Sequence, residues 1–283
     1  MDPYMLAKKL ISWVEEDAPF GDVTSELLIP SNSQVRAVIV AKSDGVAACF
    51  RDISLALEIL GLKTRVLVKD GEVFKAGEPV TEFEGPARRI LLFERTVLNT
   101  MMYLSGVATK TRRLVEIVRK VSKDTRVAAT RKIVPGLREL VKKAVVMGGG
   151  DTHRFSLSDA ILIKDNHIAL LGSVEKAIRL AKAKASFIHK IEIEVRKPED
   201  ALKAAKLGVD VVMLDNMSVS EVAKAIDLLE KHGVRRKVLV EVSGGIDEDN
   251  IVSYAALKPD VISTSSITMR PARVDLSLEV VMR

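Results

Sequence analysis

The sequence is poor in several residue types, and each shortage excludes a class of protein. The only cysteine, Cys49, cannot form an internal disulfide, which fits a reducing, cytoplasmic location, and we interpret it as a small core residue. Aromatic residues make up 4% and cations are interleaved with acids, so no nucleic-acid binding is expected despite the net charge of +6. No apolar run approaches the roughly 18 residues of a membrane span, so no membrane association is expected.

Glutamine is nearly absent as well, since it occurs once, at Gln34, while charged residues reach 29%. This balance is typical of thermophile proteins. The content of 47% apolar residues and the length of 283 residues indicate a globular protein with one large or two ordinary domains.

The first third of the chain predicts strands with helices beside them, an α+β layer. Helical periods cover residues 4–16 and 51–60, the second one closed by Gly61. Short strand patterns occupy residues 35–41, 63–68, 72–74 and 79–84. A long helical pattern follows from 87 to 120, with a break or bend expected at Ser105-Gly106.

From residue 126 onward, strand patterns alternate with amphipathic helices, which predicts a parallel sheet. Strands are expected at 126–129, 160–163, 190–195, 210–214, 237–242 and 261–263, and helices at 135–147, 173–185, 198–207, 218–232 and 247–256. Six or seven such units favour an α/β barrel, complete or open. The tail, 274–282, reads as one more strand that returns to the first domain. We therefore expect a domain at 1–110, joined by 271–283, and a barrel at 111–270.

Polar side chains follow nearly every strand of the expected barrel, and functional groups of such barrels lie where strands end. The early strand ends carry the cations Arg131, Lys132, His153, Arg154 and Lys164. Several cations in one pocket need an anion, because unpaired like charges repel, and arginine matches planar carboxylate and phosphate groups. The expected ligand is therefore small and carries several negative groups.

Two acidic strand ends, Glu194 and Asp215, are candidates for binding Mg²⁺ against a diphosphate, with ion pairing to nearby cations as the alternative. Glu192 lies two residues before Glu194 and faces the same way, one layer deeper, as a weaker candidate for the metal or a supporting partner. Lys164 is either a Schiff-base lysine or a charged contact for an anion. Its neighbours Asp165 and His167 favour the charged contact.

Two loops near the end of the barrel are candidates for holding a phosphate. Ser243-Gly244-Gly245 precedes an expected helix, and its glycines allow backbone N–H groups to approach a phosphate at the helix terminus. The loop 263–268 offers hydroxyl donors, among them Ser263, Ser265 and Ser266. A plain helix cap is the alternative interpretation of the first loop.

Several of these motifs resemble the quinolinate phosphoribosyltransferase family, whose members are also called carboxylating nicotinate-nucleotide pyrophosphorylases. The matching stretches cover nearly the whole chain: 16–17, 21–24, 94–99, 104–109, 130–132, 135–138, 148–154, 157–167 and 241–246. The sequence departs from the family pattern at Ala129, Ile133-Val134, Ser265 and Met269-Arg270. The resemblance implies an N-terminal α/β sandwich and a C-terminal barrel of six or seven strands, like type II phosphoribosyltransferases.

The resemblance also implies a reaction and a set of residues. Quinolinate and phosphoribosyl pyrophosphate would give nicotinate mononucleotide, pyrophosphate and CO₂, with Mg²⁺, in a homodimer or hexamer. The residues implied are Arg131, His153, Arg154 and Lys164 for quinolinate, with Arg95 from the partner subunit; Lys132, Ser243, Gly244, Gly245, Ser263, Ser265 and Ser266 for the donor; and Glu194 and Asp215 for Mg²⁺. Lys132, Lys164, Glu194 and Asp215 would carry the catalysis.

Two other functions stay open at this point. A related phosphoribosyltransferase for nicotinate or another base would share the donor site, but would not need the second carboxylate of quinolinate. A non-catalytic barrel that binds phosphorylated metabolites would not need the acidic pair Glu194 and Asp215.

Overall fold

The structure is a computed structural model of the chain, and it describes residues 1–281. It divides into two compact units, the first made of residues 1–112, 134–149 and the segment from 271 onward, the second of 113–133 and 150–270. The sequence placed 134–149 in the barrel domain, whereas the structure groups this segment with the first unit. The reason is helix α5 (Arg138–Met147), whose Lys143 Nζ lies 2.6 Å from Oδ1 of Asp52 in α3 (Phe50–Ile59).

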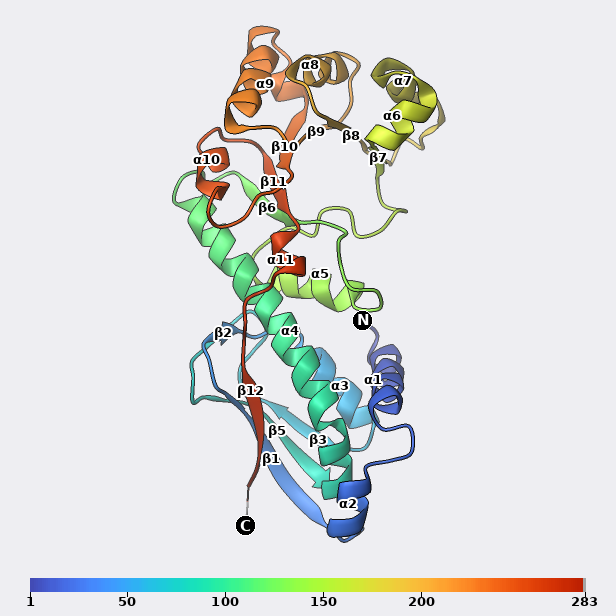
Figure 1. Ribbon diagram of the computed structural model, residues 1–283, viewed down its shortest axis with the longest axis vertical. Coiled ribbons are helices and arrows are strands. Elements are labelled where there is room, and N and C mark those ends of the chain that lie inside the picture. The colour runs from blue at the N-terminus through green and yellow to red at the C-terminus, as the bar shows by residue number, and fades with distance from the viewer. Residues whose placement is uncertain (282–283) are drawn as a thin grey trace. The chain divides into compact units, whose positions relative to one another are not determined.

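The first unit is built around a four-stranded sheet, β12-β1-β5-β3, whose neighbours all pair antiparallel. Its strands are β1 (Gln34–Ala41), β3 (Lys63–Val66), β5 (Pro79–Pro86) and β12 (Leu276–Val281), and a separate pair is formed by β2 (Gly45–Val46) and β4 (Val73–Phe74). The tail strand β12 therefore lies along β1, as Figure 1 shows. Met282, the last residue of the expected tail strand, lies outside the described residues.

Helices α1 (Pro3–Asp17) and α2 (Val23–Leu28) of the first unit begin where the sequence supplies caps. Helix α1 is capped by Asp2, whose side chain accepts from the Met5 amide, and it buries Leu6 and Leu10. Helix α2 is capped in the same way by Asp22. The sequence did not predict α2, because the proline and glycine before it were interpreted as a loop.

Helix α4 (Ala87–Arg119) is continuous, so the break expected at Ser105-Gly106 is wrong. Gly106 has another explanation. A Cβ built on this residue would lie 2.3 Å from the carbonyl oxygen of Ala272, so the absence of a side chain lets another stretch of main chain approach the helix.

The second unit contains a parallel sheet of six strands in the order β6-β11-β10-β9-β8-β7, which confirms the incomplete barrel-like fold. The strands are β6 (Arg126–Ala129), β7 (Ile161–Ile163), β8 (Ile191–Val195), β9 (Val211–Asp215), β10 (Leu239–Ser243) and β11 (Val261–Thr264). Beside β6, Asp151 forms a parallel bridge to Ala128, so the segment before His153 runs along the edge of this sheet.

Helices follow the strands of the second unit, as the alternating pattern predicted (Figure 1). They are α6 (Asp165–Leu171), α7 (Val174–Lys184), α8 (Pro198–Lys206), α9 (Val219–Lys231), the 3₁₀ turn η1 (Arg235–Lys237), α10 (Ile251–Ala255) and α11 (Ser266–Met269). Ser173 and Ser218 cap α7 and α9 with their hydroxyls. Helix α6 was not predicted, because Asp165-Asn166-His167 was interpreted as a strand-end loop. Among residues 1–281, no helix combines the length and apolar character that crossing a membrane requires.

Candidate functional site

The carboxyl ends of the parallel strands form one cavity of about 310 Å³ in the second unit. Residues two apart on a strand point to the same side of a sheet, so Glu192 and Glu194 share a face, as do Glu241 and Ser243. The cavity is lined by Thr130, Arg131, Lys132, His153, Arg154, Leu162, Lys164, Glu194, Met213, Asp215, Ser243 and Ser263. The structure therefore brings together most of the residues that the sequence selected.

Among the described residues, neither of the two arginines of the cavity forms an ion pair within salt-bridge distance of a carboxylate. Nε of Arg131 is buried and has no hydrogen-bond partner among the described residues. Burial and the nearby Arg131 both lower the pKa of Arg154, whose Nη1 has a long contact of 3.4 Å to the carbonyl of Ala160. A buried donor left unpaired costs about 1–3 kcal/mol, so an anionic ligand fits between these side chains.

The acidic residues of the cavity are paired with cations. Lys164 Nζ forms an ion pair with Glu194 Oε2, which fits a charged lysine. Asp215 accepts from Asn216 Nδ2 at 2.6 Å and lies 3.7 Å from Nε of Arg196. Glu194 and Asp215 lie on the adjacent strands β8 and β9. Their carboxylates are the hard oxygen ligands that Mg²⁺ prefers, so the two residues fit a Mg²⁺ ion.

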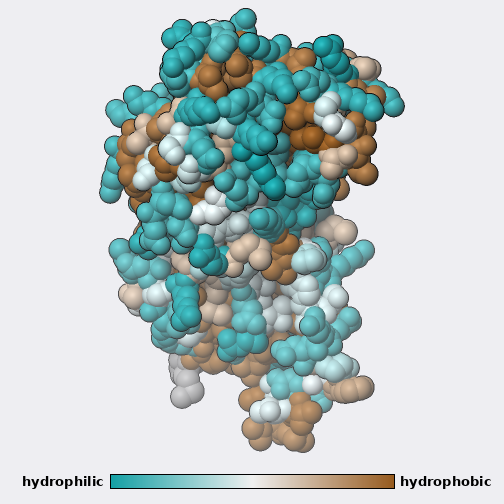
Figure 2. Space-filling view, turned by 45° about the horizontal axis from the view of Figure 1, so that its top comes forward, coloured by the Kyte–Doolittle hydropathy of each residue, from teal (hydrophilic) through white to brown (hydrophobic). Residues whose placement is uncertain are grey.

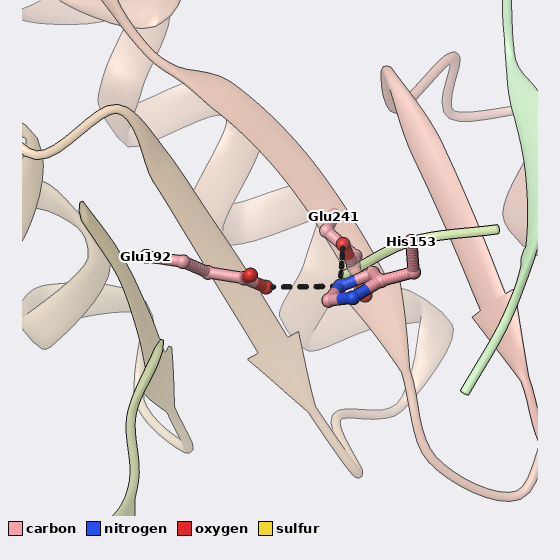
Figure 3. A group of neighbouring side chains, drawn as sticks. All are labelled: His153, Glu192 and Glu241. Atoms are coloured by element: carbon pink, nitrogen blue, oxygen red, sulfur yellow. Dashed lines mark hydrogen bonds and ion pairs between the residues drawn. The ribbon is translucent and has the colours of Figure 1, made fainter. Parts of the chain in front are cut away.

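A buried cluster lies beneath the cations and joins His153, Glu192 and Glu241 (Figure 3). The ring Nε2 of His153 is 3.0 Å from Glu241 Oε2 and 3.4 Å from Glu192 Oε1. Because Nε2 carries one proton and the Glu241 contact is shorter, Glu192 Oε1 is left without a hydrogen bond. Glu192 was expected to be a supporting partner, and here it lies against the histidine.

The proton held by this cluster is shared among its members. Burial alone lowers the pKa of His153, but the nearby carboxylates of Glu192 and Glu241 outweigh burial and raise that pKa to about 10. A ring with both nitrogens protonated has no acceptor, yet the Arg154 amide donates to Nδ1 at 2.7 Å. This geometry makes Nδ1 the acceptor of that bond, and burial raises the pKa of Glu192 in the same cluster.

The glycine loop after β10 adopts left-handed backbone conformations, with φ of 97° at Gly244 and 63° at Gly245. A Cβ on Gly244 would lie 2.4 Å from Asn216 Oδ1, so only glycine fits. The helix expected directly after this loop begins later, at Ile251, because Asn250 closes the loop by bonding to Asp247 and Gly245. The expected helix terminus at the phosphate loop is therefore wrong in its position.

The hydroxyls of the second phosphate loop differ in their surroundings. Ser263 lines the cavity, whereas Ser266 is buried and its hydroxyl bonds to Thr264 Oγ1 at 2.9 Å. Ser265 is half-buried directly before α11. Thr268 Oγ1 donates to the Lys132 carbonyl at 2.6 Å, so this loop also supports the main chain that carries the cationic strand end.

Arg95 stands apart from the other candidate residues because it belongs to the first unit. It is exposed on α4 and lines a hollow of about 360 Å³ with Trp13, Glu16, Asp17, Thr96, Asn99 and Thr100. The structure therefore does not place Arg95 in the cavity of the second unit.

A larger, more open groove of about 850 Å³ lies where strands of the second unit begin. Its charged groups serve the fold: Arg235 Nη1 pairs with Asp260 Oδ2 at 2.8 Å, and Asp210 accepts from the Ile191 amide. Size alone therefore does not mark the functional site, and the smaller cavity holds the convergent charges.

Sequence reasoning assigned no role to two residues of the site, Glu241 and Asn216. Glu241 bonds to His153 and to Ser263, and Asn216, with φ of 53°, bonds to Asp215 and packs against Gly244. A signal was present for Glu241, which lies two residues before Ser243 and so faces the same side of its strand.

The fold and the cavity define an α/β-barrel protein with a cationic site at the carboxyl ends of its strands. The family model for the C-terminal domain of quinolinate phosphoribosyl transferase matches residues 107–279, and the model for its N-terminal domain matches residues 22–105. The chain belongs to the quinolinate phosphoribosyltransferase family.

Relatives and solved structures agree with this assignment. A probable carboxylating nicotinate-nucleotide pyrophosphorylase of Methanothermobacter thermautotrophicus is 44% identical over 267 residues, covering 94% of this chain and 96% of that protein. The carboxylating nicotinate-nucleotide pyrophosphorylase of Homo sapiens is 34% identical, covering 99% and 93%. The structure of nicotinate-nucleotide pyrophosphorylase from Francisella tularensis has a TM-score of 0.90 and 33% identity, covering 99% and 98%.

Proposed function

We propose that the protein transfers the phosphoribosyl group of phosphoribosyl pyrophosphate to quinolinate and releases CO₂, giving nicotinate mononucleotide and pyrophosphate in NAD biosynthesis. One observation carries the proposal. Arg131, Arg154 and Lys164 meet in one cavity, with the buried Nε of Arg131 lacking a partner. A pyridine with two carboxylates supplies the planar anions that guanidinium groups bind through paired hydrogen bonds.

The donor is bound by other residues of the same cavity. Ser243 offers a hydroxyl beside Ser263, whose own hydroxyl proton goes to Glu241, and the backbone of Gly244 and Gly245 takes conformations that let a 5′-phosphate approach closely. Lys132, exposed at the end of β6, contacts the pyrophosphate and stabilises its developing charge.

The reaction follows from this placement. The bond between C1 of the sugar and the pyrophosphate breaks, and the electron pair leaves with the pyrophosphate. The pyridine nitrogen then donates its pair to C1. The resulting pyridinium accepts the electron pair released when the adjacent carboxylate leaves as CO₂, and a proton takes the position of the lost carboxylate. Holding two anions together in one cavity supplies much of the acceleration.

Glu194 and Asp215 are the residues that would hold Mg²⁺. The ion supplies charge neutralisation for the leaving pyrophosphate. In the protein alone, Lys164 neutralises Glu194, so the lysine is available for a substrate carboxylate once Glu194 has another cation.

Two parallel incubations test the reaction. The protein is mixed with phosphoribosyl pyrophosphate, Mg²⁺ and either quinolinate or nicotinate, and mononucleotide and CO₂ are followed. Formation of both products from quinolinate alone is expected. Product from nicotinate alone would retain the donor site but refute the two-carboxylate clamp, and no product from either would refute catalysis. Chelation of Mg²⁺ is expected to abolish turnover.

We also propose that the active site is shared between subunits of a homodimer or a larger assembly, with Arg95 reaching the acceptor from the neighbouring subunit. Arg95 is exposed and belongs to a different unit from the cavity. Exposed apolar side chains offer surface for contact, including Phe20 (94% exposed), Leu170 (87%) and Phe187 (99%), and Figure 2 shows apolar patches among hydrophilic residues.

Mixing two inactive variants tests the shared site. Arg95→Ala and Lys164→Ala proteins are inactive alone, and their mixture is expected to regain part of the activity once subunits exchange. Exchange is verified independently with tagged subunits. Exchange without any recovered activity would refute the shared site.

A further inference from the structure

We propose that Glu241 is a positioning residue that ties the His153–Arg154 turn to the Ser263 hydroxyl. The identities of the two ligands, the dicarboxylate acceptor and the phosphorylated donor, rest on the proposed function. The contacts of Glu241 do not depend on it. Glu241 is 2% exposed, on β10, and does not line the cavity itself. It lies beneath residues that do, so it acts through them.

Both carboxylate oxygens of Glu241 are used as acceptors. Oε2 lies 3.0 Å from His153 Nε2, and Oε1 accepts from Ser263 Oγ at 2.5 Å. Ser263 Oγ is in turn 2.9 Å from Ser243 Oγ. A carboxylate accepts at both oxygens, whereas an amide has one acceptor and one donor. Glutamine at this position therefore cannot keep both contacts, although it has the same shape.

The position of the His153 ring in turn restricts the main chain at Arg154. His153 has φ of 53°, a conformation that is uncommon for residues other than glycine, and Asp151 Oδ1 fixes it by accepting from the His153 amide at 2.8 Å. The Arg154 amide donates to Nδ1 of the same ring. With Nε2 anchored on Glu241, the ring holds the main chain at the point where the Arg154 side chain leaves for the cavity.

The arrangement joins two sets of cavity residues. Ser263 and Ser243 are proposed for the phosphate, and Arg154 is proposed for the dicarboxylate. Because Glu241 is buried, its hydrogen bonds are poorly screened by water. A change in its contact with Ser263 therefore alters its contact with His153, and the reverse. Glu192, on β8, faces the same ring but at 3.4 Å, and its Oε1 has no hydrogen-bond partner among the described residues.

The experiment compares Glu241→Gln with Glu230→Gln, an exposed control on α9 that lies outside this cavity. Nitrogen NMR of labelled histidine reports the ring protonation of His153 in the free protein, and hydrogen exchange reports the Arg154 amide. In the unaltered protein, Nδ1 is expected to be unprotonated and the amide protected. Glu241→Gln is expected to mix the ring tautomers and to speed amide exchange at Arg154 roughly tenfold or more, whereas Glu230→Gln changes neither.

Kinetics supply the second measurement. Glu241→Gln is expected to raise KM for both substrates by roughly tenfold or more, whereas Arg154→Ala raises KM for the acceptor alone. Should Glu241→Gln fail to fold, Ser263→Ala tests the same link, because faster exchange at Arg154 is expected although the two residues share no bond. Unchanged ring protonation and exchange would overturn the inference. Absence of turnover in the unaltered protein would refute the proposed reaction and leave the NMR result valid.

Discussion

Replacing Arg131 with alanine should change ligand affinity and stability in opposite directions. In the free protein, Nε of Arg131 is buried without a partner, and the charge of Arg131 lowers the pKa of Arg154. Removing the side chain therefore removes an unpaired donor, which costs about 1–3 kcal/mol, together with a like-charge repulsion. The free energy of unfolding should be unchanged or up to about 2 kcal/mol higher, after subtraction of the lost aliphatic packing.

Binding of the acceptor should fall sharply in the same variant. A guanidinium binds a carboxylate through two charge-assisted hydrogen bonds, each contributing about 1.5–3 kcal/mol. Loss of both corresponds to roughly a hundredfold weaker binding or more, since 1.4 kcal/mol is about tenfold.

Calorimetric titration with quinolinate and urea unfolding measure the two quantities, and Arg179→Ala, an exposed arginine on α7, is the matched control. A variant that binds quinolinate normally but loses several kcal/mol of stability would show that Arg131 serves the fold rather than the ligand.

Three further changes test other parts of the site. Arg154→Ala should abolish turnover at ordinary substrate concentrations through lost quinolinate affinity, and normal steady-state kinetics would contradict its role. Gly244→Ala should raise KM for the donor at least tenfold, because the new Cβ meets Asn216 Oδ1 at 2.4 Å and φ is 97°; an unchanged KM would show that the loop is not at the phosphate. Because the pKa of His153 is raised from 6.5 to about 10, the stability from the proton of its cluster is fully present below about pH 6.5 and is lost as pH rises toward 10. The free energy of unfolding of His153→Gln, measured at several pH values, should therefore approach that of the unaltered protein at high pH. A difference that grows with pH would contradict this assignment.

Much of the second unit could be predicted from the sequence because its strands are buried and apolar and its helices have clear caps. The strand patterns at 126–129 and 190–195 agree with β6 and β8 to within a residue. The short helices α2 and α6 were missed, because six or seven residues are too few for a helical period and their polar caps resemble loops. Gly106 was misinterpreted for a related reason: a glycine that breaks a helix and one that lets another segment approach look alike in one sequence.

The site was predicted residue by residue only where charge at a strand end carried the signal. Strand ends converge in any parallel barrel, so Arg131, Lys164 and Glu194 could be assigned to one cavity. The hydrogen bonds between the site residues could not be predicted, because they depend on which oxygen faces which donor. Glu241 and Asn216 are examples, since their roles follow from contacts between strands that lie far apart in the sequence.

The pairing of β12 with β1 has a consequence for how the chain folds during synthesis. Leu276 pairs with Ala41 and Val281 with Arg36, so the sheet of the first unit joins segments separated by more than two hundred residues. Until β12 emerges from the ribosome, one side of β1 is an unpaired edge while the whole second unit is being made. Contacts of such long sequence separation form slowly, so the nascent first unit should depend on chaperones or on rapid completion of synthesis more than the second unit does.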